Sequence, residues 1–467
     1  EYEAVIGLEI HAQLNTRTKM FCPCPVTFGQ EPNSRVCPVC LGMPGSLPVP
    51  NRRAVEMGIR VALATHCRIA SRCCFARKNY FYPDLPKGYQ ISQYDEPLAT
   101  DGWLEVNGRR IGIIRMHLEE DAGKLLHGPE GSLVDFNRTG VPLLEIVTAP
   151  DLRTPQEASD FLQELRAVLQ YLEVCDGDME KGNLRCDANV SVRPRGSTQL
   201  GTKVELKNLN SFRFLRQALQ YEIDRQVEAL RSGEPLAQET RLWDPARGMS
   251  LPMRTKEEAH DYRYFPDPDL VPLRLEASLV ERLRASLPEL PQQRRERFMT
   301  QYGLPAYDAR VLTSSKALAD WFERCVASYP KAKAVSNWVM SEVLRLVDPE
   351  GVEGLRVRPE QLAALLRLVD RGTISNKIAK EVLEEMARTG QDPDRIVQQR
   401  GLSQISDPDR LRAIAEAVLR DHPQQVEQYR AGKQKLLGFF VGQVMKRTGG
   451  RAHPQLTGQI LRELLEG

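Results

Sequence analysis

The spacing at which apolar residues recur changes once along this chain, and that change restricts the fold more than any other feature. Up to about residue 285, short segments alternate apolar and polar residues between Gly, Pro, Asn and Asp, which predicts strands. After a proline-marked, charged segment at 286–298, apolar residues recur at helical spacing. Because 467 residues exceed one ordinary core, we expect an α+β chain with a strand-rich domain followed by helical domains.

Three stretches near the C-terminus predict helices, at 375–390, 407–420 and 433–447. In the second, Asp407 can cap the helix and Pro408 suits its first turn. We interpret their apolar stripes as core-facing. The sequence contains no internal repeat.

Composition is typical of a soluble globular protein, with 41% hydrophobic and 27% charged residues. No apolar run approaches the roughly 20 residues of a membrane span. The first residues lack a basic segment followed by a continuous apolar stretch, so they do not resemble a signal peptide. We therefore expect a cytoplasmic protein without a membrane partner.

The net charge is only +2, but the window from Gln428 to Arg462 holds seven basic residues and no acidic one. A segment of one sign in a near-neutral chain predicts a face for a polyanion. A solvated basic helix face explains the same charges, and charge alone leaves both interpretations open.

The strand predicted over Val5–Leu14 places Glu9, His11 and Gln13 on one face and apolar residues on the other. A carboxylate beside an imidazole on a rigid strand can bind a cation. A solvent-facing edge strand is the alternative.

The same mixture of polar residues recurs on three further predicted strands, at 111–120, 185–193 and 203–207. Their polar faces carry Arg115, His117 and Glu119; Arg185, Asp187, Asn189, Ser191 and Arg193; and Lys203, Glu205 and Lys207. Carboxylates suit magnesium, and Arg and Lys neutralise a transferring phosphoryl group, so a phosphoryl-transfer cavity is one interpretation and a general polar binding surface the other. The chain has no phosphate-binding loop, dinucleotide fingerprint, G-x-S-x-G elbow or amidase signature. Any ATP must therefore be used on a sheet lined with carboxylates.

Four of the ten cysteines are clustered as C-x-C and C-x-x-C, at Cys22, Cys24, Cys37 and Cys40. Two close pairs can supply the four thiolates of a tetrahedral zinc site, in which the zinc would be structural because no position stays open. A redox role is the alternative, but the C-x-x-C pair lacks the strand-to-helix context that lowers a thiol pKa.

Ten separated blocks, in order, resemble the B subunits of the tRNA-dependent amidotransferases along essentially the whole chain. They are VIGLEIH (5–11), VCPVCLGMPGSLPVP (36–50), RKNYFYP (77–83), KGYQISQ (87–93), LEEDAGK (118–124), PLLEIVT (142–148), LRCDAN (184–189), ELKNLNSF (205–212), DYRYFPDP (261–268) and GFFVGQVMK (438–446). The resemblance implies a mainly antiparallel, glutamine-synthetase-like cradle domain over 1–290, a helical domain over 291–405 and a YqeY-like, tRNA-binding tail over 406–467.

The resemblance also implies a carbon–nitrogen ligase that corrects Glu-tRNA(Gln) or Asp-tRNA(Asn). In this family the chain of this type uses ATP to phosphorylate the side-chain carboxylate. Ammonia that the amidase chain releases from glutamine then displaces the phosphate. The implied partners are the amidase chain and the small third chain of the heterotrimer, together with tRNA(Gln) or tRNA(Asn) and in some assemblies the cognate aminoacyl-tRNA synthetase.

For the site, the resemblance implies magnesium ligands beside ATP at Glu9, His11, Glu120 and Glu145. The residues expected to line the same cavity are Lys78, Asp187, Asn189, Glu205 and Lys207. Strict alternation places Glu119, not Glu120, on the face with His117. The family match favours Glu120, which we adopt as the expectation. The four cysteines match a family motif that some members replace.

The alternative function is a non-catalytic scaffold whose polar sheet face grips RNA. The carboxylates of that face argue against it, because they would repel phosphate without an intervening cation. For the tail, we expect the five residues Lys433, Lys435, Lys446, Arg447 and Arg451 to point outward and bind the body of the tRNA. Docking on a partner protein is the alternative.

Overall fold

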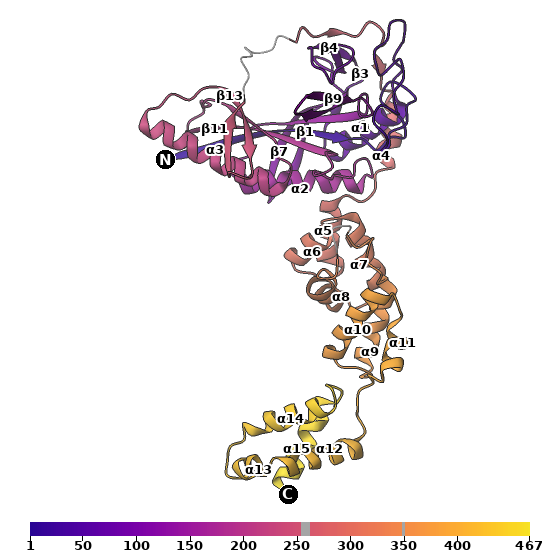
Figure 1. The fold of residues 1–467 in the computed structure, drawn as a ribbon, viewed down its shortest axis with the longest axis vertical. Helices are drawn as coiled ribbons and strands as arrows, with labels where there is room; N and C mark the ends of the chain where they lie inside the picture. Colours follow the sequence, from indigo (N-terminus) through magenta and orange to yellow (C-terminus); the bar gives the residue numbers. More distant parts are fainter. Residues whose placement is uncertain (254–261, 348–350) are drawn as a thin grey trace. The chain divides into compact units, whose positions relative to one another are not determined.

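The computed structural model describes residues 1–253, 262–347 and 351–467. The chain divides into two compact units, Glu1–Gln293 and Arg294–Gly467. The first unit holds the sheets and the second is helical (Figure 1). The α+β class is therefore confirmed, with the strand-rich part first.

A nine-stranded sheet forms the centre of the first unit. In sheet order its strands are β14 (Met249–Pro252), β13 (Glu239–Asp244), β12 (Val204–Lys207), β11 (Leu184–Pro194), β1 (Tyr2–Gln13), β10 (Pro142–Thr148), β7 (Arg109–Glu120), β6 (Ala99–Val106) and β2 (Arg68–Ile69). Every neighbouring pair is antiparallel except β12 and β13, so the sheet is mainly antiparallel as expected.

Helices cover one face of this sheet, and Figure 1 shows α2 and α3 running along it. The helices that lie wholly within the described residues of the first unit are α1 (Arg52–Ala64), α2 (Pro155–Tyr171), α3 (Phe212–Ser232) and α4 (Ala277–Ala285). Ile6, Leu8 and Ile10 of β1 point into the core beneath them and are fully buried. Because side chains alternate along a strand, the residues between them, Glu9 and His11 included, face the opposite side.

Three small sheets complete the part of the first unit that the structure describes. They are β15 (Phe265–Pro266), β4 (Ala76–Asn79) and β5 (Tyr89–Ser92); β16 (Leu273–Arg274) with β3 (Arg72–Cys73); and β8 (Lys124–Gly128) with β9 (Gly131–Asp135). Strand β5 packs against β7. The packing brings residues 89–92 to the end of a central strand.

The second unit is all-helical over its described residues. Its helices are α5 (Pro291–Gln301, which spans the unit boundary), α6 (Ala306–Leu312), α7 (Lys316–Ser328), α8 (Ala332–Trp338), the π-helical turn η1 (Val339–Val343), α9 (Pro359–Asp370), α10 (Asn376–Thr389), α11 (Pro393–Arg400), α12 (Pro408–Asp421), α13 (Pro423–Arg430), α14 (Leu436–Arg447) and α15 (Pro454–Glu466). None of the helices in the described ranges is long and apolar enough to cross a membrane.

The three predicted C-terminal helices are present as α10, α12 and α14. As expected, the Asp407 side chain caps α12, accepting a hydrogen bond of 3.0 Å from the backbone N–H of Asp409. The second unit contains two hydrophobic clusters, one running from Phe298 to Leu402 and the other from Ile405 to Leu465. The change of cluster falls at the predicted boundary near residue 405, although the three-domain division remains a prediction.

Candidate functional site

The polar face of the central sheet gathers titratable side chains from five strands. Strand register makes this possible, because His11 of β1 lies opposite Glu145 of β10, and Glu145 lies opposite His117 of β7. On the other side of β1, Glu9 pairs in register with Asp187. Residues far apart in sequence therefore share one face by pairing alone.

The first group on this face consists of His11, Glu119 and Glu145. One ligand atom from each lies within 4.8 Å of the others. His11 Nε2 lies 3.1 Å from Glu119 Oε1, and His117 Nδ1 lies 3.4 Å from Glu145 Oε2. One imidazole and two carboxylates are a ligand set that can hold a divalent cation.

Opposing effects set the pKa values of this group. Burial lowers the pKa of His11, but its hydrogen bond to Glu119 and the charges of Glu119 and Glu145 together raise it to about 9. Burial raises the pKa of Glu145, but the bond to His117 and the charge of His11 hold it at about 2. At neutral pH the imidazole of His11 is therefore protonated, and its positive charge lies beside the carboxylates of Glu119 and Glu145.

The second group consists of Glu9, Asp187 and Glu205, with carboxylate oxygens also within 4.8 Å of one another. Burial and the charges of its neighbours raise the pKa of Glu9. Lys207 Nζ lies 3.1 Å from Asp187 and 3.5 Å from Glu205, and Asn189 Nδ2 donates to Glu9 at 3.3 Å. Three carboxylates against one lysine leave an excess of negative charge that suits a second cation.

Lys78 reaches the same region from β4. Its Nζ lies 4.5 Å from the centre of the Tyr262 ring, and its charge contributes to the low pKa of Glu145. The structure therefore gathers Glu9, His11 and Glu145 on one face with the expected cavity-lining residues Lys78, Asp187, Asn189, Glu205 and Lys207.

Glu120 is the predicted residue that the structure does not bring into either group. Its carboxylate pairs with Lys87 and accepts a hydrogen bond of 3.1 Å from the backbone N–H of Ile91. Strand β7 stays in regular register through Glu120, which lies opposite Pro142, so alternation holds to the end of the strand. Glu119 takes the place beside His11 that the family match had given to Glu120.

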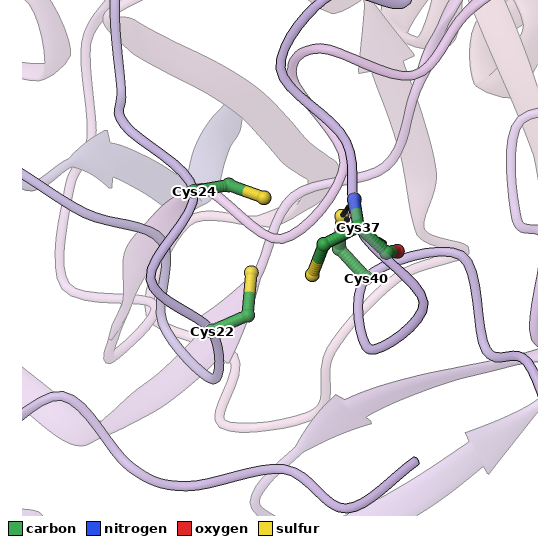
Figure 2. Close-up of side chains that lie close together, drawn as sticks. All are labelled: Cys22, Cys24, Cys37 and Cys40. Atoms are coloured by element: carbon green, nitrogen blue, oxygen red, sulfur yellow. Dashed lines mark hydrogen bonds between the residues drawn. The ribbon is translucent and has the colours of Figure 1, made fainter. Parts of the chain in front are cut away.

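The four clustered cysteines also come together, from two loops whose sulfur atoms face one another (Figure 2). Their Sγ atoms lie within 4.8 Å of one another. Cys40 Sγ accepts hydrogen bonds from the backbone N–H of Cys37 at 3.2 Å and from Lys19 Nζ at 3.4 Å. The hydrogen bond with Cys22, the N–H of Cys37 and the charge of Lys19 lower the pKa of Cys40 to about 4. A thiolate within a four-sulfur group fits a closed metal site.

Comparison with known proteins decides the family. The family described as GatB/GatE catalytic domain matches residues 4–281, and the GatB domain matches residues 320–465. The chain is 60% identical to the B subunit of the aspartyl/glutamyl-tRNA(Asn/Gln) amidotransferase of Moorella thermoacetica over 475 residues, which cover 100% of both chains. It is 57% identical to the corresponding protein of Thermoanaerobacter pseudethanolicus (100% of this chain, 99% of the relative) and 55% identical to that of Thermodesulfovibrio yellowstonii (100% of both). The chain belongs to this family of B subunits.

Membership in the B-subunit family confirms the resemblance carried by the ten blocks. It also supports the expected role of a carbon–nitrogen ligase component in the amidation of Glu-tRNA(Gln) and Asp-tRNA(Asn), and does not favour the non-catalytic scaffold.

The expected basic surface of the B-subunit tail is only partly exposed. Lys433, Lys435 and Lys446 are exposed. Arg447 is exposed but pairs with Asp421, and the half-buried Arg451 donates to the carbonyl oxygens of Gly401 at 2.7 Å and Thr448 at 3.0 Å. Both arginines are therefore taken up in part by contacts within the second unit.

The set of site residues predicted from the sequence left out three residues that the structure places at the site. Glu119 and His117 lie on the polar face that alternation identified, so the pattern contained the signal. Ser92, which donates to Glu119 at 3.0 Å, comes from the separate strand β5. No periodicity within 111–120 could have indicated that packing.

Proposed function

We propose that this chain uses ATP to phosphorylate the side-chain carboxylate of Glu-tRNA(Gln) or Asp-tRNA(Asn). Ammonia supplied by a glutaminase partner then displaces phosphate, leaving the amide. Activation is needed because ammonia does not displace oxide from a carboxylate. The observation that supports this proposal is the pair of adjacent, cation-suited groups on one sheet face, His11–Glu119–Glu145 and Glu9–Asp187–Glu205.

Each group is proposed to hold one magnesium ion, the first through one imidazole and two carboxylates and the second through three carboxylates. Bound magnesium supplies charge stabilisation to a transferring phosphoryl group and orients its oxygens. Lys207 and Lys78 neutralise further charge from two sides of the face. Asn189 orients Glu9 through its amide hydrogen bond. The absence of a glycine-rich phosphate loop in the sequence agrees with this use of carboxylates and lysines.

The four cysteines are proposed to hold one structural zinc ion. Two observations support it: the four sulfurs converge, and Lys19 places a buried cation against Cys40. Since all four ligands come from the protein, this site takes no part in the reaction.

The proposed partners are the glutamine-hydrolysing amidase chain, the small third chain of the heterotrimer and tRNA(Gln) or tRNA(Asn), in the cytoplasm. The tail over 406–467 is proposed to bind the body of the tRNA through phosphate contacts, with Lys433, Lys435 and Lys446 among its exposed cations. Phosphate contacts position an RNA without reading its sequence.

The test uses His11→Ala and Glu119→Gln in the assembled amidotransferase. Both variants should lose tRNA-dependent ATP cleavage and amide formation by about a thousandfold, since each removes a ligand of one proposed magnesium ion. Glutamine hydrolysis by the amidase chain should persist. The matched control is Glu222→Gln, a buried carboxylate on α3 under the opposite face of the sheet, paired with Arg225 at 2.6 Å.

Amide formation at the control's rate in both variants would refute the site. ATP cleavage that does not depend on charged tRNA would instead point to another use of the nucleotide. If His11→Ala and Glu119→Gln bind tRNA as well as the control but do not cleave ATP, the result agrees with the proposal, because the scaffold function predicts no loss of amidation.

A further inference from the structure

Lys87 and Glu120 form a buried ion pair at the end of β7. Their side chains are only 6% and 3% exposed. Glu120 is also held by the segment that follows Lys87: its carboxylate accepts from the N–H of Ile91 at 3.1 Å, and its carbonyl accepts from Gln90 Nε2 at 2.6 Å. All of these contacts tie β5 and the loop before it to the last residue of β7.

The same segment holds the neighbouring glutamate, which faces the other way. Ser92 Oγ donates to Glu119 Oε2 at 3.0 Å, while Glu119 Oε1 lies 3.1 Å from His11 Nε2. Ile91 and Ser92 are consecutive on β5, so one strand binds Glu120 with its backbone and Glu119 with its hydroxyl. The position of β5 on β7 therefore holds one oxygen of the Glu119 carboxylate, while the other oxygen lies against His11 of β1.

The loop that carries Cys37, Cys40 and Gly42, here called the cysteine loop, packs against Lys87 from another side. Gly42 lies two residues after Cys40 in the same turn, and its N–H donates to the carbonyl oxygen of Val39 at 3.0 Å. A Cβ at Gly42 would lie 2.3 Å from Lys87 Cγ and 3.1 Å from Lys87 Cα, and the φ of Gly42 is +67°. The loop backbone thus packs directly on the lysine, and only glycine fits there.

We propose that the Lys87–Glu120 pair is a positioning element for the reaction: it holds β5 on β7 so that Ser92 aims the Glu119 carboxylate at the magnesium site, and the cysteine loop keeps Lys87 in place. The inference rests on the proposed function, in which Glu119 is a magnesium ligand. It gives Glu120 a role that accounts for its place in the LEEDAGK block without making it a ligand. Groups that orient metal ligands typically change metal affinity or activity by about 10–100-fold when removed.

The experiment measures tRNA-dependent ATP cleavage against free Mg²⁺ in the assembled amidotransferase, with Lys87→Met, Glu120→Gln and Ser92→Ala. The Mg²⁺ concentration for half-maximal rate should rise about tenfold in each, while the KM for charged tRNA stays unchanged. Lys87→Arg keeps the charge and should restore most of the wild-type Mg²⁺ requirement. The control Glu222→Gln also breaks a buried ion pair but should leave the Mg²⁺ requirement unchanged.

Gly42→Ala tests the loop separately and should move the Mg²⁺ requirement in the same direction without changing Lys87 or Glu120 chemically. Ser92→Ala keeps the test valid if the ion-pair variants fail to fold, because it removes a single hydroxyl. An unchanged Mg²⁺ requirement in folded Glu120→Gln and Ser92→Ala would overturn the positioning role. If Glu119→Gln itself left the Mg²⁺ dependence unchanged, the proposed function would fail first, so the two failures are distinguishable.

Discussion

The sheet face of the first unit and the tail of the second both carry dense charge, yet they hold it in opposite ways. On the sheet, Glu9, His11 and Glu145 are half-buried side chains fixed by strand register. In the tail, Lys433, Lys435 and Lys446 are exposed on and around one helix. Charges that are held close together and away from water interact strongly and depend on exact position, whereas exposed charges act over a distance and are screened by salt.

This difference indicates two kinds of recognition within one chain. The sheet face suits a small, highly charged group whose atoms must be placed within a fraction of an ångström. The tail suits a large polyanion that is bound through many replaceable contacts. The following variants test whether the two regions really behave in these different ways.

Among these variants, the largest effect is expected at the second carboxylate group. Glu205→Gln and Asp187→Asn should each lower the rate of amide formation by about a hundredfold or more, since each removes a proposed magnesium ligand and leaves Lys207 without one of its partners. Single-turnover amidation, compared with that of Glu222→Gln, measures this. Raising the salt concentration should not mimic the defect. Activity within a few-fold of wild type would show that Glu9, Asp187 and Glu205 are a polar cluster without a required cation. The proposed site would then hold only the magnesium ion of the first group.

A smaller effect, with the opposite salt behaviour, is expected for the tail. Replacing Lys433, Lys435 and Lys446 together by Ala should weaken tRNA binding by about tenfold at low salt and reduce the steepness of its salt dependence. The matched control replaces three exposed lysines of the same unit outside the tail, Lys333, Lys377 and Lys380. Equal affinities for both triple variants at two salt concentrations would mean that the basic window is a solvated face.

Arg451→Ala should affect stability more than tRNA binding, because its guanidinium is bonded to two carbonyl oxygens.

The sheet face and the tail should also differ in how they affect the pH dependence of stability. The pKa of His11 is about 9 in the folded chain and near the usual value of about 6.5 when unfolded. A folded pKa above the unfolded one adds stability that is complete below pH 6.5 and is lost as pH rises through 9. Without magnesium, the first unit should therefore lose about 2 kcal/mol between pH 7 and pH 9.

Urea unfolding in the presence of a chelator measures this loss, with His11→Gln as the comparison. The variant should show a flatter profile over that pH range, whereas the triple lysine variant of the tail should follow wild type. Parallel profiles for wild type and His11→Gln would show that the imidazole is not held charged by Glu119 and Glu145.

Much of the fold and the site followed from alternation and spacing. Period-two patterns placed Glu9, His11, Asp187 and Glu205 on one face because register in an antiparallel sheet preserves faces. Contacts made by residues outside the predicted strands could not be predicted from these patterns. Ser92 and Lys87 reach β7 from a strand and a loop that sequence spacing does not connect to it.

The choice between Glu119 and Glu120 also depended on contacts that the sequence does not reveal. Alternation pointed to Glu119, and a motif match displaced it, although both residues lie in the matched block. A motif marks residues as constrained without saying which partner constrains them. In this chain Glu120 is constrained by Lys87 and Ile91, and Glu119 by His11 and Ser92.

The smallest catalytic effect is expected at the cysteine loop, which belongs to neither charged region. Cys24→Ser or Cys37→Ser should reduce the zinc content from about one ion per chain to none, because a tetrahedral site of four protein sulfurs does not survive the loss of one thiolate. Amide formation should fall only a few-fold, since the cysteines are not proposed magnesium ligands and the loop packs on Lys87, which pairs with Glu120. Cys67→Ser, a buried cysteine outside the cluster, is the matched control and should keep its zinc. Elemental analysis of chelator-free preparations, together with the Mg²⁺ titration of ATP cleavage, gives both readouts. A preparation of the wild-type chain without zinc would refute the metal site. A loss of activity as large as that of His11→Ala would instead place the loop within the reaction machinery. The loop could then no longer be regarded as a support that lies apart from the charged residues of the sheet face.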